Sequence, residues 1–275
     1  MPKKVAVLLA AGTLLYAAAC AYLYLNQDNL IFHPTREWAS TPKKIDIEYE
    51  DVSFISADGL KLSGWFVEAK SERGVILFCH GNSRNISAEL APLKMFHDLG
   101  FSMLLFDYRG YGKSEGKPSE VGMLMDAQAA WDYLTLVKKI PPSRLIVQGR
   151  SLGAGVAIPL AVKVTPRALL VDASFKSLAD VAAKRYPIFP VRLLLKSRFD
   201  SLKNIARIQC PVLITHSKDD QIIPFEQGLA LYHAAPSPKV FNPITGPHDN
   251  KDVPESQVMY RAGVEKFLNS IFAKG

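Results

Sequence analysis

The sequence predicts an α/β fold in which a mostly parallel central sheet is covered by helices on both faces. Three observations predict it: apolar runs without alternation, helix-period segments between these runs, and polar turn residues directly after them. Continuous apolar runs are typical of strands buried on both faces, and alternating strands and helices favour a parallel sheet. Ligands bind beyond the carboxyl ends of such strands, so the residues that follow each strand are the candidates for a site.

The elements are expected in this order. Residues 45–69 alternate and turn at 57–59 (Ala-Asp-Gly), which predicts an antiparallel hairpin. Buried strands are then predicted at 75–79, 102–106, 145–148, 168–171, 212–215 and 239–243. Helices of period 3.6 are predicted at 121–138, 152–164, 225–235 and 256–272.

The amino-terminal segment is the other strong signal. Residues 5–25 form an uncharged apolar run of 21 residues, which at about 1.5 Å per residue covers the roughly 30 Å hydrocarbon core of a bilayer. Tyr22 and Tyr24 near its end suit an interfacial aromatic belt. We therefore expect a retained transmembrane anchor over residues 1–29 and one folded domain over residues 30–275.

The orientation of the anchor follows from its flanks. Lys3 and Lys4 precede the apolar run, whereas the Asn-Gln-Asp after it carries no positive charge. By the positive-inside tendency the folded domain lies outside the cytoplasm, in the periplasm of a Gram-negative cell. A cleaved secretory signal is an alternative, because Ala17 to Ala19 are small residues. A lipoprotein anchored at Cys20 is another, although leucine usually stands where Ala17 does.

Three cysteines indicate little. Cys79 ends one predicted strand and Cys210 begins another, and both are expected to be buried and inert; a disulfide between them is the alternative outside the cytoplasm. No cysteine and histidine cluster has zinc spacing, so we predict no metal and no cofactor. No nucleic-acid partner is expected, and the sequence does not determine an oligomeric state.

The residues 149–153, Gly-Arg-Ser-Leu-Gly, lie between a predicted strand and a predicted helix. A Gly-x-Ser-x-Gly turn in that position is typical of a nucleophile elbow, in which the serine takes a strained backbone conformation above the sheet edge. On its own the pentapeptide also fits an ordinary tight turn. The loops after later predicted strands supply the other chemistry, because Asp220 follows the strand at 212–215 and His248 follows the last strand.

With these motifs the chain resembles the α/β-hydrolases of the BEM46-like group, which are relatives of membrane-anchored hydrolases that cleave lysophospholipids or protein-bound acyl groups. The resemblance covers about residues 31–272. Its motifs are Phe-His-Pro at 32–34, His-Gly-Asn at 80–82, Phe-Asp-Tyr-Arg-Gly-Tyr-Gly-Lys-Ser at 106–114, the elbow, and Asp220 with Ile-Pro at 223–224. One departure is Gly-Pro-His-Asp-Asn at 246–250, where relatives more often have Gly-Gly-His-Asn-Asp. Another is Ser217, where the family often has glycine.

The resemblance implies a site with serine, acid and histidine in the order expected for this fold. Ser151 is the expected nucleophile, His248 the base and Asp220 the acid that orients the histidine. Asp219 and Asp172 are competing candidates for the acid. The backbone N–H groups of Asn82 and Leu152 are the expected oxyanion hole.

Other polar residues near these motifs are expected to be structural. His80 is expected to form a structural turn under the oxyanion loop. Arg109, Tyr111 and Ser114 are expected to brace loops. The remaining histidines, His33, His216 and His233, are expected to be structural or solvated.

A short lid is expected over residues 176–207, built from two or three short helices because Pro187 and Pro190 break any long one. It carries eight basic and two acidic residues, which is +6 of the chain's net charge of +7. The basic residues are Lys176, Lys184, Arg185, Arg192, Lys196, Arg198, Lys203 and Arg207, against Asp180 and Asp200. Together with its apolar residues, this composition suits an anionic membrane surface, or else a solvated basic lid.

The leading hypothesis is a membrane-anchored serine hydrolase that cleaves carboxylic ester or thioester acyl groups, with a small acyl compound such as a lysophospholipid as substrate. A serine peptidase-like hydrolase is the second reading, although a basic lid disfavours an amine substrate. A catalytically silent interaction protein on the same fold is the third reading, and it would predict the loss of a triad residue.

Overall fold

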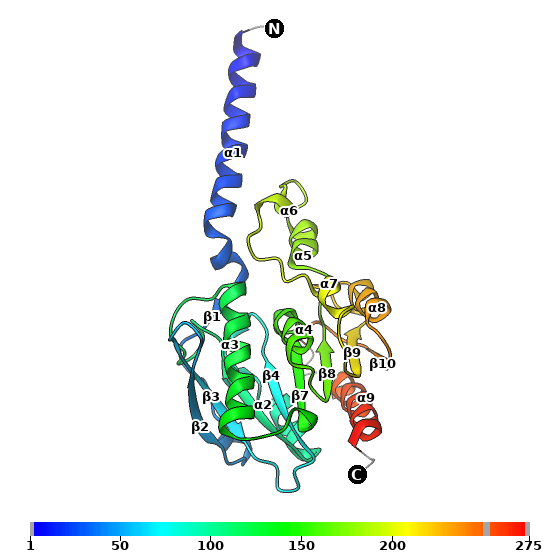
Figure 1. The fold of residues 1–275 in the computed structure, drawn as a ribbon. Helices are drawn as coiled ribbons and strands as arrows, with labels where there is room; N and C mark the ends of the chain where they lie inside the picture. Colours follow the sequence, from blue (N-terminus) through cyan, green and yellow to red (C-terminus); the bar gives the residue numbers. More distant parts are fainter. Residues whose placement is uncertain (1–2, 250–253, 273–275) are drawn as a thin grey trace.

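The computed structural model describes residues 3–249 and 254–272. Its centre is an eight-stranded sheet with the order β10-β9-β8-β7-β4-β6-β3-β2 (Figure 1). The strands are β2 (Glu50–Ile55), β3 (Lys61–Val67), β4 (Gly74–Cys79), β6 (Phe101–Asp107), β7 (Leu145–Arg150), β8 (Ala168–Asp172), β9 (Val212–Ser217) and β10 (Lys239–Ile244).

The pairing confirms the expected hairpin and the parallel sheet. β2 pairs antiparallel with β3, and β3 pairs antiparallel with β6. From β6 through β4, β7, β8 and β9 to β10 every pair is parallel. The loops after β4, β7, β9 and β10 therefore gather at one edge of the sheet.

Helices cover both faces of the sheet, as the sequence predicts. The larger helices are α2 (Leu90–Asp98), α3 (Glu120–Asp132), α4 (Leu152–Val164), α8 (Phe225–Ala234) and α9 (Pro254–Phe272). Short turns of helix lie at Pro42–Ile45, Ile86–Ala88, Tyr133–Val137 and Pro142–Arg144. Alternate residues of β4 separate into two cores: Val75 and Leu77 pack with α3 and α4, whereas Ile76 and Phe78 pack with α2 and α9. This period of two is the reason that strands buried on both faces read as unbroken apolar runs.

Helix α2 is not among the elements that the sequence predicted. It has nine residues and contains Pro92, which lies in its first turn, where a proline interrupts no hydrogen bond. A short segment with a proline shows little periodicity, so the sequence pattern does not reveal it.

Helix α1 (Lys3–Ile31) stands out from the body of the molecule as a single long helix (Figure 1). Its best 18-residue window has a mean hydropathy of 1.9 and is not buried, so the helix is long and apolar enough to cross a membrane. The segment after it joins the body of the molecule. There β1 (His33–Pro34) pairs in parallel with β5 (Ser83–Arg84), which directly follows the predicted oxyanion loop.

The lid region contains three short helices, as expected: α5 (Leu178–Arg185), α6 (Val191–Leu194) and α7 (Ser201–Ile205). Pro187 and Pro190 lie between α5 and α6 and separate them. Helices α5 and α6 lie beside the lower part of α1 (Figure 1).

Cys79 and Cys210 are buried and free, and burial raises the pKa of each thiol to about 12. Both therefore remain protonated and unreactive at neutral pH, as predicted from the sequence.

Candidate active site

Ser151 occupies a sharp turn between β7 and α4. Its backbone has φ 53° and ψ −120°, a region that residues other than glycine rarely adopt. The two flanking glycines allow close approach: a Cβ on Gly149 would lie 2.5 Å from the Cα of Ala154, and one on Gly153 would overlap the carbonyl oxygen of Cys79. The turn therefore has the geometry of a nucleophile elbow, and the backbone strain is concentrated at the serine.

Three candidate residues from distant parts of the chain meet at this turn. The Oγ of Ser151 lies 3.1 Å from Nε2 of His248. The Nδ1 of His248 lies 2.6 Å from Oδ2 of Asp220. The second carboxylate oxygen of Asp220 accepts hydrogen bonds from the N–H groups of Ile222 (2.9 Å) and Ile223 (2.8 Å). The serine, the histidine and the acid thus form one continuous relay.

The surroundings keep Asp220 ionised. Burial alone would raise the pKa of this carboxyl, but the hydrogen bond from His248 and those from the two turn N–H groups lower it below its ordinary value. Beneath it lies His216, which is fully buried, and burial lowers the pKa of this imidazole. Its Nε2 is 2.9 Å from the carbonyl oxygen of Ile223 and 3.5 Å from Oδ2 of Asp220. A neutral His216 therefore supports the Asp220 turn without competing with His248 for the carboxylate.

The two competing acids have other partners. Oδ2 of Asp219 accepts a hydrogen bond from the N–H of Gly246 at 2.9 Å, so this side chain braces the loop that carries the histidine. Asp172 is buried, which raises its pKa, and its Oδ2 accepts from Tyr260 at 2.6 Å and Gln148 at 2.7 Å. Neither carboxylate contacts His248 within the described part of the chain.

Arg150 has a function in the site that was not predicted from the sequence. Its Nη2 donates to the carbonyl oxygen of His248 at 3.0 Å and to Oδ1 of Asp249 at 3.2 Å. The residue before the serine therefore holds the histidine loop, and its place inside the elbow pentapeptide was the available signal. Asn250, the last residue of the motif at 246–250, lies outside the described residues.

The loop after β4 lies directly against the elbow. A Cβ on Gly81 would be 3.9 Å from the Cβ of Ser151, which places Asn82 next to the serine. The carbonyl oxygen of Asn82 accepts from the N–H of His33 (3.0 Å) and from the hydroxyl of Tyr111 (2.8 Å). Its side chain donates to the carbonyl oxygen of Ile31 at 2.9 Å. Several bonds therefore fix this peptide.

Leu152 supplies the second predicted donor. It is the first residue of α4, so its N–H has no acceptor within the helix. Both predicted donors consequently lie beside Ser151.

The expected braces are structural, as predicted. Arg109 pairs with Asp126 and Asp58, each at 2.7 Å. The hydroxyl of Ser114 donates to the carbonyl oxygen of Asp107 at 2.6 Å. His80 is fully buried, with its ring centroid 4.4 Å from that of Tyr108. None of these side chains lines the cavity described next.

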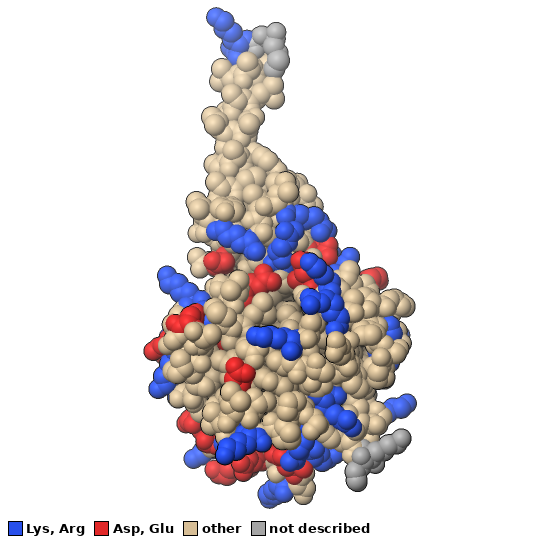
Figure 2. Space-filling model, viewed as in Figure 1, with Lys and Arg blue, Asp and Glu red and all other residues tan. Residues whose placement is uncertain are grey.

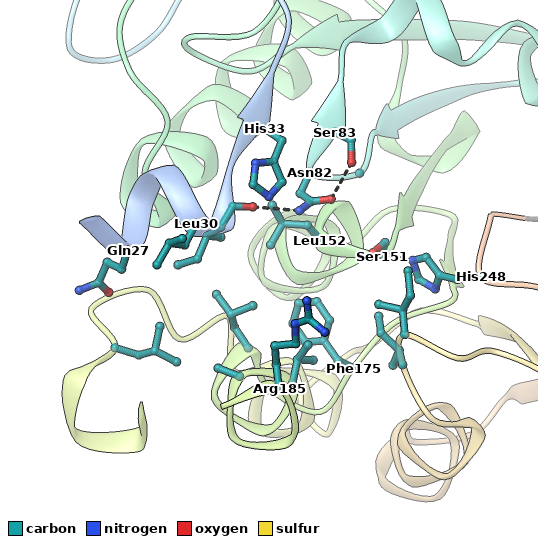
Figure 3. A pocket seen from close by; sticks show the side chains of 18 of the residues that line it. Gln27, Leu30, His33, Asn82, Ser83, Ser151, Leu152, Phe175, Arg185 and His248 are labelled. Atoms are coloured by element: carbon teal, nitrogen blue, oxygen red, sulfur yellow. Dashed lines mark hydrogen bonds between the residues drawn. The ribbon is translucent and has the colours of Figure 1, made fainter. Parts of the chain in front are cut away.

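A cavity of about 650 Å³ opens beside Ser151 and His248. One wall is the lid, which contributes residues from Leu178 to Leu195, and another wall is the end of α1. Figure 3 shows Leu30 and Gln27 of α1 across the pocket from Ser151. His33, which was expected to be structural or solvated, also lines this cavity. The participation of α1 was not expected.

Basic residues gather where the stalk of α1 meets the body. Figure 2 shows lysine and arginine side chains, with some carboxylates among them, around the base of a stalk that carries no charge along its middle and has lysines at its tip. Within the lid, Asp180 pairs with Arg192 at 2.5 Å and lies 3.9 Å from the ammonium group of Lys176. Most of the basic excess of the lid is therefore not neutralised by the lid's own carboxylates.

The topology of the sheet, the elbow and the order of the site residues define an α/β-hydrolase fold. An esterase of Pyrococcus furiosus shares this fold, with a TM-score of 0.73 at 24% identity over 88% of this chain and 98% of that one. A family model described as "Serine aminopeptidase, S33" matches residues 70–175.

Curated relatives extend the similarity to nearly the whole chain. An uncharacterized protein of Mycobacterium tuberculosis is 35% identical over 98% of this chain and 95% of its own length. Protein bem46 of Schizosaccharomyces pombe is 30% identical over 80% of this chain and 79% of its own length. The chain belongs to the BEM46-like family of α/β-hydrolases.

Proposed function

We propose that this protein is a membrane-anchored serine hydrolase that cleaves carboxylic ester or thioester bonds of acyl substrates. The observation that carries the proposal is the relay from Ser151 through His248 to an ionised Asp220. A serine hydroxyl is a weak nucleophile unless a base accepts its proton. Nε2 of His248 is within hydrogen-bond distance to act as that base, while Asp220 holds the Nδ1–H tautomer.

The reaction then runs in two stages. Ser151 attacks the acyl carbon as His248 takes the hydroxyl proton, and the N–H groups of Asn82 and Leu152 stabilise the oxyanion. His248 gives the proton to the departing alcohol or thiol, which leaves an acyl-serine ester. A water molecule, deprotonated by His248, attacks that ester and releases the carboxylic acid, and the proton returns to Ser151.

The cavity favours an acyl substrate. Its volume is in the range of small-molecule sites, and leucine, valine, isoleucine and phenylalanine side chains dominate its lining. Arg185 is the lid cation that lines it. An apolar pocket with a cation beside it suits an acyl chain attached to an anionic head, such as a lysophospholipid.

The anchor and the lid favour action at a bilayer. The Tyr16 hydroxyl donates to the carbonyl oxygen of Ile188 at 2.8 Å, and its ring stacks on Phe189 at 5.6 Å between centroids. Tyr16 lies nine residues before Leu25, the end of the apolar run, which is about 14 Å along a helix. If α1 spans a bilayer, this tip of the lid dips below the membrane surface, and the exposed Ile188 suits that position.

The same geometry supports an extracytoplasmic domain. Lys3 and Lys4 lie at the far end of α1 from the folded domain, which favours a cytoplasmic amino terminus. A lipoprotein attached at Cys20 is the alternative form of anchoring. Labelling of a Lys163→Cys variant with a membrane-impermeant maleimide in intact cells tests the location of the domain. Labelling indicates an extracytoplasmic domain, and labelling only after lysis indicates a cytoplasmic one.

A peptidase is the second reading, because the matching family model carries an aminopeptidase description. A peptide substrate with a free terminal amine requires a carboxylate near the serine that is not already paired with a cation. The carboxylates that line the cavity are Glu89 and Asp249, and Asp249 pairs with Arg84 and Arg150 at 3.2 Å each. Glu89 is 4% exposed, which leaves little of it open to a substrate amine. The ester reading is therefore preferred.

A fluorophosphonate probe tests the nucleophile. The full-length protein in nonionic micelles should be labelled, and Ser151→Ala should abolish labelling. Ser83→Ala is the matched control, because Ser83 also lines the cavity but lies outside the relay. Equal labelling of Ser151→Ala and wild type would overturn the assignment, and an unlabelled wild type would favour the silent interaction protein.

The substrate class is tested with p-nitrophenyl esters of rising chain length, lysophospholipids and aminoacyl-p-nitroanilides. We expect longer acyl chains to be preferred. Cleavage confined to acetyl and butyryl esters would contradict a lipid substrate, and preferential cleavage of the anilides would favour the peptidase.

A further inference from the structure

One face of helix α1 forms a wall of the candidate active-site cavity. Leu23, Gln27 and Leu30 all line this cavity. Their spacing of four and three residues places them on the same side of a helix, two turns from end to end. At 1.5 Å per residue Leu23 lies about 10 Å from Leu30 along the axis of α1, toward the amino-terminal end of the helix. The face therefore extends the cavity along the helix in the direction of the bilayer.

Gln27 fixes this face against the lid. It is 5% exposed, although most other residues of α1 are exposed. Its Nε2 donates to the carbonyl oxygen of Leu194 at 3.3 Å, and its Oε1 accepts from the N–H of Lys196 at 2.7 Å. The ammonium group of Lys196 also lies 4.3 Å from the ring centre of Tyr24. The distance between α1 and the lid is consequently set by specific bonds.

The other end of the face is tied to the predicted oxyanion loop. The carbonyl oxygen of Ile31 accepts from the side chain of Asn82, and Ile31 lines the cavity as well. The chain then continues into β1, which pairs with β5 directly after Asn82. The helix is therefore held at the serine end through Ile31 and at the lid end through Gln27.

We propose that this face of α1 is the specificity-determining wall for the acyl chain of the substrate. The chain runs from Ser151 past Leu30 toward Leu23, so that these two side chains set the accepted chain length at two depths. The membrane anchor is thus part of the substrate site as well as a tether. This inference rests on the proposed acyl hydrolase function.

Tryptophan substitutions at the two depths test the proposal in full-length protein reconstituted in nanodiscs. Leu30→Trp should lower the ratio of kcat/KM for the dodecanoyl ester to kcat/KM for the butyryl ester at least tenfold relative to wild type. Each methylene displaced from an apolar site costs about 0.8 kcal/mol, or about fourfold in rate, so the loss of a few methylenes suffices. Leu23→Trp should still hydrolyse esters of medium chain length that Leu30→Trp no longer hydrolyses. Leu25→Trp is the control, because Leu25 is 74% exposed and does not line the cavity.

Leu30→Ala keeps the proposal testable if a tryptophan variant misfolds. Its smaller side chain should widen the cavity, so that esters with longer acyl chains are also accepted. If Leu30→Ala and Leu23→Trp both leave the ratio of dodecanoyl to butyryl rates unchanged while wild type hydrolyses both esters, the wall assignment is wrong and the proposed hydrolase stands. If wild type hydrolyses no ester, the proposed function fails and this inference fails with it.

Discussion

The strained backbone at Ser151 predicts an unusual order of stability between two variants that lack the serine hydroxyl. With φ 53° and ψ −120°, the residue lies in a region that costs a non-glycine residue about 1–3 kcal/mol. Ser151→Gly and Ser151→Ala both remove the hydroxyl and its hydrogen bond to His248, so these losses cancel in a comparison. The glycine variant alone relieves the strain.

The expected difference follows from two terms. Relief of about 2 kcal/mol, the middle of this range, is opposed by the extra freedom that glycine gives the unfolded chain, about 0.4–1 kcal/mol. The glycine variant should therefore be more stable by about 1–1.6 kcal/mol. For a chain of this size, 1 kcal/mol shifts Tm by about 2–4 °C. We expect Ser151→Gly to melt about 2–6 °C above Ser151→Ala.

Differential scanning calorimetry of both variants in the same nonionic micelles measures the difference. Ser53 provides the matched control, because it is an exposed residue of the regular strand β2. In a strand interior, glycine is less stable than alanine by about 0.5–1 kcal/mol, so the order should reverse at Ser53. If Ser151→Ala melts at or above Ser151→Gly while the Ser53 pair behaves as expected, the elbow stores no such strain and the reasoning is refuted.

Two further predictions concern carboxylates. Asp220→Asn keeps an acceptor for the turn N–H groups but loses the charge that holds His248; we expect kcat for ester cleavage to fall about 10³–10⁴-fold, and a decrease below tenfold would contradict the relay. Burial raises the pKa of Asp107 to about 6, although Trp38 and the N–H of Ile86 donate to it. Because the folded pKa exceeds the unfolded value, its stabilising contribution is complete below about pH 4 and is lost as the pH rises through about 6, by about 3 kcal/mol at most. In urea unfolding, the advantage of wild type over Asp107→Asn should shrink between pH 4.5 and pH 7, and a constant difference would contradict the raised pKa.

The sequence predicts those parts of the site that depend on local chain chemistry. The elbow requires glycine at positions 149 and 153 because a Cβ there would overlap the chain, so the requirement is visible in the sequence. The order of Ser151, Asp220 and His248 follows from the parallel sheet, which brings the loops after β7, β9 and β10 to one edge. Asp219 and Asp220 are harder to separate from sequence. They differ in the structure because only Asp220 accepts the Ile222 and Ile223 N–H groups while contacting His248.

Contacts between distant segments could not be predicted in the same way. The bond from Arg150 to the carbonyl oxygen of His248 joins residues 98 positions apart, and no local pattern marks it. The wall formed by α1 is hidden for a different reason. An apolar helix that is hydrophobic on all sides carries no periodicity, so Leu23 and Leu25 are equivalent in the sequence although only Leu23 lines the cavity. Gln27, a polar residue two positions after the apolar run, was a local sign of a buried contact.

The position of α1 also bears on why an anchor of this kind would remain attached. Asn82 donates to Ile31 through its side chain, while its own backbone N–H is a predicted oxyanion donor. A displacement of the end of α1 would therefore shift a proposed oxyanion donor, in addition to opening the cavity. Cleavage before Cys20 would leave Leu23, Gln27, Leu30 and Ile31 in place, so a lipoprotein form keeps the complete wall. The wall thus requires the part of α1 from Leu23 to Ile31, whereas anchoring requires the apolar residues before it or a lipid on Cys20.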